Sequence, residues 1–202
     1  MPAIGLGGSK SSMALTTWKT DPTHTDISFS AKHMMVTSVR GKFADVDGTL
    51  LLDEENPANS SGLFTVMAAS LNTGVQKRDD HLRSADFFDA ATYPAMTFES
   101  TRVEPVGGDD YRVTGNLTIR GTTRPITFDV EYLGVYQGFG DARRAGFHAT
   151  AKLNREEWGL SWNVSLETGG WLVGKEIKLE IDVAAEQVTA AAAKSTAAGV
   201  AA

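Results

Sequence analysis

The chain has 202 residues, of which 42% are hydrophobic and 22% charged, and its formal net charge is -6. Length and composition of this kind are typical of a globular protein with a sizeable core. The acidic balance disfavours a nucleic-acid partner and electrostatic docking on anionic membranes. The absence of cysteine excludes disulfides and thiolate chemistry.

The two ends of the chain differ in composition from its middle. Residues 1–16 contain a Gly-Gly-Ser-Lys-Ser-Ser run and predict a flexible tail, and the alanine-rich residues 185–202 predict a disordered one. The N-terminus lacks a basic region and a sustained apolar run, so we expect no signal peptide and a cytoplasmic protein. Residues 17–184 are expected to form one domain, with no apolar stretch long enough for a membrane-spanning helix.

The first half of this domain has the residue pattern of β-strands. Apolar residues alternate with serine and lysine over 27–32, which is the period of a half-buried strand. A long strand-like run follows over 39–52, where Gly41 and Gly48 suit bends or bulges in a curved sheet. The segment 63–71 is apolar on both faces.

The segment 75–93 is the exception, because its composition is helical and it ends before Pro94. It predicts one or two short helices. Beyond it, alternation returns in five segments: 96–103, 111–120, 126–132, 147–153 and 177–183. The fold class expected is therefore all-β, with about eight antiparallel strands.

About eight antiparallel strands can close into a barrel that encloses one small ligand. The expected inward faces carry several small residues, which favours a hollow interior: Ala31, Ala44, Gly48, Ala68, Gly115, Ala149 and Ala151. Aromatic residues interspersed among them would line such a space and offer dispersion contacts to a hydrocarbon chain. The alternative is a β-sandwich, or a barrel whose core the same aromatic residues fill.

A set of short motifs spread over about residues 18–184 resembles the YceI-like family of lipocalin-like, polyisoprenoid-binding proteins. The motifs include Asp21-Pro22-Thr23-His24, Val39-Arg40-Gly41-Lys42-Phe43, Arg78-Asp79-Asp80-His81-Leu82-Arg83-Ser84, Asp86-Phe87-Phe88-Asp89 and Asn154-Arg155. The resemblance implies an extended antiparallel barrel with a long apolar tunnel that holds an isoprenoid or fatty-acyl chain. It also implies homodimers. The chain departs from the family in its alanine-rich tail and in lacking the secretion signal of many members.

The candidate ligand-binding residues combine inward aromatic and small side chains with a polar mouth. They are Phe29, His33, Phe43, Arg78, His81, Phe87, Phe98, Gly115, Phe128, Phe147 and Ala149.

The polar candidates lie in the densest charged segment, residues 77–83. Arg78 and His81 are hypothesised to contact a polar head group, since arginine suits phosphate and carboxylate. The alternative is an ordinary solvated helix whose charges pair locally.

The histidines show no pattern of a metal site. By strand phase, His33 points inward and His148 outward, and no HxH or HExxH spacing occurs. Structural histidines and no metal or cofactor are therefore expected. The tryptophans at 158, 162 and 171 are interpreted as packing or rim residues.

The function predicted is binding of a long apolar lipid for transport, storage or protection. Candidates for that ligand are an isoprenoid, a polyprenyl phosphate, a quinone or a fatty-acyl chain. The alternative is an enzyme that modifies such a lipid with His33 or His81 as acid or base. The sequence offers no GxSxG motif or other recognisable pair of nucleophile and base, so no enzyme is expected.

Overall fold

The computed structural model describes residues 15–138, 142–167 and 169–188. Of the tails predicted for residues 1–16 and 185–202, residues 1–14 and 189–202 lie outside this range. The strands are β1 (Thr16–Thr20), β2 (Asp26–His33), β3 (Thr37–Phe43), β4 (Val46–Leu52), β5 (Ser61–Met67), β6 (Leu71–Asn72), β7 (Ala95–Gly107), β8 (Asp110–Ile119), β9 (Thr122–Gln137), β10 (Arg143–Asn154) and β11 (Val173–Gln187). The helices are α1 (Gln76–Arg83) and the short 3-10 helices η1 (Pro57–Asn59), η2 (Ala68–Ser70) and η3 (Arg155–Trp158).

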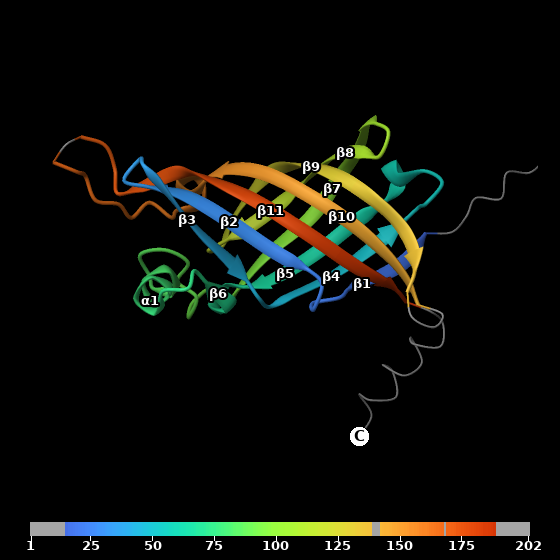
Figure 1. The fold of residues 1–202 in the computed structure, drawn as a ribbon, viewed down its shortest axis with the longest axis horizontal. Helices are drawn as coiled ribbons and strands as arrows, with labels where there is room; N and C mark the ends of the chain where they lie inside the picture. The colour runs from blue at the N-terminus through green and yellow to red at the C-terminus, as the bar shows by residue number, and fades with distance from the viewer. Residues whose placement is uncertain (1–14, 139–141, 168, 189–202) are drawn as a thin grey trace, which may run out of the picture.

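All these strands belong to one antiparallel sheet that closes on itself (Figure 1). The strand order is β1-β4-β5-β7-β8-β9-β10-β11-β2-β3-β6, and β1 also pairs with β11. Strands β1 and β2 follow each other in sequence, both pair with β11, and together they form one bent path. Strands β3 and β4 form a second bent path, and β5 and β6 form a third. With each bent path counted once, the fold is the closed eight-stranded barrel that the sequence predicted.

The predicted alternation decides which side chains enter the barrel. Along β9, Phe128, Val130 and Tyr132 line the interior, whereas the acidic residues between them face outward. The turn from β8 to β9 has only Arg120 and Gly121, both with positive φ (49° and 71°). Positive φ at both positions is the backbone of the tight hairpin turn whose twist matches the flanking strands.

In three strands, a glycine leaves room for an aromatic ring of the neighbouring strand to pack over it. A Cβ atom on Gly41 would lie 2.5 Å from the Phe29 ring, and a Cβ on Gly115 would lie 2.5 Å from the Phe98 ring. Gly48 has the same relation to a ring on β5. The sequence favoured bends or bulges at Gly41 and Gly48, and no bulge occurs at either residue, since both lie in a continuous register. The β7–β8 pair carries its irregularities elsewhere, between residues 100 and 102 and between 105 and 107.

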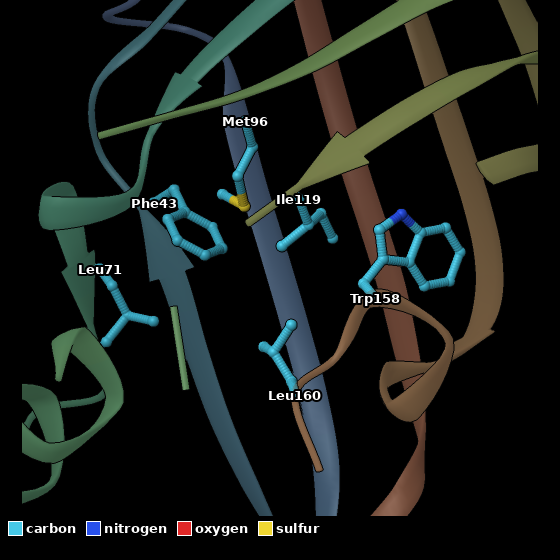
Figure 2. Packing of buried hydrophobic residues seen from close by; sticks show 6 residues of the cluster. All are labelled: Phe43, Leu71, Met96, Ile119, Trp158 and Leu160. Carbon is cyan, nitrogen blue, oxygen red and sulfur yellow. The ribbon is translucent and has the colours of Figure 1, made fainter. Parts of the chain in front are cut away.

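The buried apolar residues form two separate clusters instead of one continuous core. The first gathers side chains from five parts of the chain near α1, as Figure 2 shows: Phe43, Leu71, Met96, Ile119, Trp158 and Leu160. The second lies where β1, β4, β10 and β11 meet: Trp18, Leu50, Leu52, Ala145 and Ala185. Residues between the clusters are therefore free to surround a cavity.

The C-terminal strand extends further than the sequence predicted. The domain was expected to end at residue 184, but Ala185 is fully buried and Gln187 pairs with Trp18 of β1. The Val188 amide donates to the Thr17 carbonyl at 2.8 Å. The last residues of β11 therefore belong to the seam that closes the barrel. Within the described residues, no helix has the length and apolar character needed to cross a membrane.

Candidate ligand-binding cavity

A cavity of about 450 Å³ runs inside the barrel from one end to the other. Figure 1 shows α1 and the segments 159–167 and 169–172 at one end, here named the α1 end, and the β4–β5 loop at the other. The lining includes His81 and Trp162 at the α1 end, and Glu54 and Tyr132 at the loop end. Most lining side chains are aliphatic or aromatic, and a volume of this size is typical of a small-molecule site.

Ten of the eleven predicted ligand-binding residues line this cavity: Phe29, His33, Phe43, Arg78, His81, Phe87, Phe98, Phe128, Phe147 and Ala149. Gly115 does not, because the ring of Phe98 covers it.

The small residues explain the hollow interior less well than predicted. Ala31 and Ala149 line the cavity, but Ala44, Gly48, Ala68 and Ala151 do not. Gly48, like Gly115, accommodates a neighbouring ring, and Ala68 is buried in the 3-10 helix η2. The space exists because the two packed clusters lie apart.

Arg78 and Asp79 are positioned by the turn that precedes α1. The buried carboxylate of Asp79 accepts hydrogen bonds from the backbone amide and the hydroxyl of Thr73, at 2.9 and 2.5 Å. Arg78 in turn donates from Nε to the Thr73 hydroxyl at 2.7 Å and from Nη2 to the Thr73 carbonyl at 2.9 Å. Thr73 thus links the Arg78 guanidinium to a buried carboxylate.

His81 connects α1 with the aromatic wall of the cavity. Its ring packs edge-on against Phe87 and Trp162, with centroid distances of 5.1 and 4.6 Å. Its Nε2 lies 2.9 Å from a carboxylate oxygen of Asp86. One wall of the cavity therefore contains the titratable ring of His81, which is already hydrogen-bonded to Asp86.

Arg155 is a cavity residue that the sequence analysis did not select. It is only 3% exposed, and its guanidinium lies 5.9 Å over the Phe87 ring. The alternation of side chains along β10 indicates its direction, because Leu153 faces inward and Arg155 follows it by two residues. Burial lowers the pKa of Arg155, which marks its charge as poorly solvated.

Polar contacts surround Tyr132 at the loop end of the cavity. Burial, with the nearby Glu54 carboxylate, raises the pKa of Tyr132 and keeps the phenol neutral. Glu54 accepts two hydrogen bonds from Arg143, at 2.9 and 2.8 Å. The same contact raises the pKa of Arg143.

His148 and His24 each pair with an aspartate outside the cavity. His148 faces away from the cavity, and its Nδ1 lies 2.7 Å from Asp182. His24 lies 2.7 Å from Asp21, and hydrogen bonds from Thr23 and His24 lower the pKa of Asp21 to about 2. In the described part of the chain, no group of three or more His, Asp or Glu side chains could hold a metal ion.

Comparison with known proteins gives a consistent result. The family model described as YceI-like domain matches residues 18–185. A UPF0312 protein of Staphylococcus aureus is 36% identical over 167 residues, which covers 82% of this chain and 95% of the relative.

Solved structures share the same fold. A YceI protein of Campylobacter jejuni is 32% identical, with a TM-score of 0.67, over 78% of this chain and 90% of that one. A domain of Saccharophagus degradans, described as polyisoprenoid-binding, is 15% identical with a TM-score of 0.60, over 86% of this chain and 99% of that one. At that identity, the second likeness concerns the fold alone.

Proposed function

This chain belongs to the YceI-like family, and from this premise we propose that it binds one long apolar lipid chain inside its barrel. An isoprenoid is the class of ligand that we favour. The polyisoprenoid-binding domain of Saccharophagus degradans, which has the same fold, supports that choice. The protein would carry, store or protect this lipid without changing it.

The observation that carries the proposal is the shape and lining of the cavity. It extends through the barrel, and side chains such as Phe98, Val113, Ala149 and Leu179 surround its middle. Such a surface offers dispersion contacts along a hydrocarbon chain and almost no hydrogen bonds. Each buried methylene would contribute about 0.8 kcal/mol. A chain threaded along the barrel gains most from this geometry.

The residues that line the cavity fit lipid binding better than they fit catalysis. Catalysis by His33 or His81 would need a nucleophile or a second acid-base group within hydrogen-bonding reach. Among the described cavity residues, no serine or threonine hydroxyl is hydrogen-bonded to either histidine. His81 does have a second acid-base group in Asp86 at 2.9 Å, but no described cavity hydroxyl completes a pair of nucleophile and base with it, so binding remains the better supported function.

Native mass spectrometry of the purified protein, followed by organic extraction, tests the proposal. We expect a bound species whose mass matches one long-chain lipid, recovered chemically unaltered after incubation. Delipidated protein should rebind one equivalent of an added isoprenoid such as geranylgeraniol. Failure to retain or rebind any long-chain lipid would refute the proposal, and turnover of the added lipid would restore the enzyme alternative.

A further inference from the structure

Five large apolar side chains are exposed at the α1 end of the barrel, and they are here named the tip patch. Three lie in the β2–β3 turn and two in the segments before β11: Met34, Met35, Val36, Val164 and Trp171. Their exposed fractions range from 45% for Val164 to 80% for Val36. Figure 1 shows both parts of the chain at this end of the barrel. Exposed apolar side chains that gather in one place mark an interaction site.

Hydrogen bonds and packing join the two parts of the tip patch. The Met34 amide donates to the Leu172 carbonyl at 2.9 Å. A Cβ atom on Gly170 would lie 2.6 Å from the Met35 sulfur, so the Met35 thioether packs on the backbone at Gly170. The Leu172 amide donates to the Val164 carbonyl at 2.9 Å. The β2–β3 turn and the segments before β11 therefore form one contiguous surface.

The β2–β3 turn holds its methionines in a backbone conformation that methionine disfavours. Met34 and Met35 both have positive φ, at 49° and 60°, and the Val36 amide donates to the His33 carbonyl at 3.2 Å. A two-residue hairpin turn of this geometry favours Asn-Gly. Among the described residues, neither methionine belongs to a packed cluster that would compensate. Strained residues concentrate at functional sites, which indicates that this turn contacts a partner.

The tip patch borders the cavity of the barrel. The residues next to it in the chain line that cavity: Lys32, His33, Leu172 and Val173. An apolar lipid that leaves a bilayer through water exposes its whole hydrocarbon chain, which is unfavourable. A protein that touches the bilayer with the rim of its cavity avoids this exposure. The position of the tip patch therefore favours a lipid surface as its partner.

The size of the tip patch also fits a lipid surface better than a protein surface. A stable protein interface takes about 20 to 30 residues from each side, whereas the tip patch has five. Binding at a bilayer surface depends on the apolar area that enters the boundary between head groups and acyl chains. The indole ring of Trp171 suits this boundary, because one edge is polar and the rest apolar.

The charges beside the tip patch select a neutral bilayer. The exposed Lys32 forms no ion pair among the described residues, and the exposed Glu167 lies between the two tip-patch residues that precede β11. One side chain of each sign matches a zwitterionic head group, whose phosphate a lysine can reach while its stem stays on apolar surface. The net charge of -6 opposes approach to an anionic surface.

We propose that the tip patch is a docking surface for a neutral phospholipid bilayer. Its five side chains enter the boundary between head groups and acyl chains, and the α1 end of the cavity then faces the lipid. This inference goes beyond the proposed function, because it names the surface from which the barrel takes its ligand. It rests on the proposed function for its purpose, but docking is measured without any ligand in the cavity.

Flotation of the full-length protein with phosphatidylcholine vesicles tests the docking. Wild-type protein should float with the vesicles, and replacing a third of the lipid with phosphatidylglycerol should not strengthen binding. Raising NaCl from about 0.1 M to about 0.5 M should change binding less than about twofold, because the contact is apolar. The double variant Met35→Asn with Val36→Ser should bind at least about tenfold more weakly. Asparagine tolerates positive φ, so this variant keeps its turn.

Leu133→Ser with Val106→Ser is the matched control, because both residues are exposed apolar side chains outside the tip patch, at 56% and 59%. This pair should bind vesicles as wild type does. Equal losses in the two double variants would overturn the proposal, as would wild-type binding to anionic vesicles alone. Absence of vesicle binding, with a wild-type dimer that Met35→Asn with Val36→Ser dissociates in sedimentation velocity, would assign the patch to a second copy of the chain instead.

The two proposals fail in different ways. Titration with dissolved geranylgeraniol should give the same affinity for wild type and for Met35→Asn with Val36→Ser, because the cavity lining is unchanged. Wild-type protein that binds geranylgeraniol but no vesicles would overturn the docking and leave the proposed function intact. Protein that binds vesicles but no long-chain lipid would refute the proposed function and leave the docking intact.

Tryptophan quenching locates the contact independently. Bromine quenches tryptophan emission only at short range, so vesicles of phosphatidylcholine brominated on its acyl chains should quench the emission of Trp171. Trp171→Phe keeps an apolar ring at the tip, so it should still float with the vesicles but lose most of the quenching. Undiminished quenching in Trp171→Phe would show that another part of the chain touches the bilayer and would overturn the proposal.

Discussion

His148 illustrates how an outward residue on this barrel is stabilised. Its Nδ1 lies 2.7 Å from the Asp182 carboxylate, and the two residues are directly opposed on β10 and β11. The Asp182 hydrogen bond raises the pKa of His148. A raised folded-state pKa contributes stability below the unfolded value near 6.5, and this contribution is lost as the pH rises through the folded value.

We therefore predict that His148→Gln lowers the free energy of unfolding at pH 6 and changes it little at pH 9. The pair is partly exposed, so the difference at pH 6 should stay below about 1 kcal/mol. Urea unfolding at the two pH values measures it. Asp182→Asn should show the same dependence on pH, and a loss of equal size at both pH values would contradict the assignment.

At the scale of the element, pairing between strands decides the role of each glycine. Gly115 lies opposite Ser100 in the β7–β8 register, and the Phe98 ring crosses over it. A Cβ at this position would also lie 2.5 Å from the backbone oxygen of Glu99, which cannot move without the strand. Phe98 packs against Phe128 at 5.2 Å, so displacing its ring would disturb the cavity wall.

Gly115→Ala is therefore expected to reduce the free energy of unfolding by roughly 1–3 kcal/mol, the usual range for overpacking. Gly146→Ala provides the matched control on β10. A Cβ atom there would lie 3.3 Å from the Leu133 Cβ, a tight contact but a much longer one than the 2.5 Å distances at Gly115. Denaturant unfolding compares the two variants. Similar losses in both would show that the ring over Gly115 is not the cause.

The end of β11 yields a second prediction for an element. Its last residues pair with β1 and bury Ala185, so they hold the seam of the barrel. A chain that stops after residue 184 should unfold at a clearly lower temperature than one that stops after residue 188. The comparison isolates four residues, and thermal unfolding followed by circular dichroism measures it. Equal melting temperatures would mean that the seam does not depend on them.

For the whole molecule, the separation of the two packed clusters creates a continuous apolar space. Ala149 contributes to the lining midway along β10, where a larger side chain would project into that space. The neighbouring Thr150 is exposed on the outer face. The two positions therefore separate an effect on the cavity from an effect on the strand.

Ala149→Phe should weaken binding of geranylgeraniol about tenfold or more, because losing contacts to two methylenes costs about 1.6 kcal/mol. Thr150→Phe should leave the affinity unchanged. Calorimetric titration measures both variants, and circular dichroism checks that each remains folded. If Ala149→Phe binds as tightly as wild type, the lipid lies outside this part of the barrel.

Features that depend on neighbours along the chain could be predicted from the sequence. Alternation placed Phe128 and Phe147 inside and His148 outside, and the helical composition of residues 75–93 predicted α1. Short motifs indicated the family that the comparisons confirm. These features follow from local periodicity and residue type, because a strand exposes alternate faces whatever its partners are.

Features that depend on distant partners were decided only by the tertiary structure. Gly115 accommodates a ring because the β7–β8 register brings Phe98 to it, and residues 185–187 are ordered because β1 pairs with them. Arg155 is buried against the carbonyls of Leu160, Val173 and Gly174 only because the fold brings these segments to it. Register, closure and burial each join residues far apart in sequence, and local patterning carries no information about those pairings.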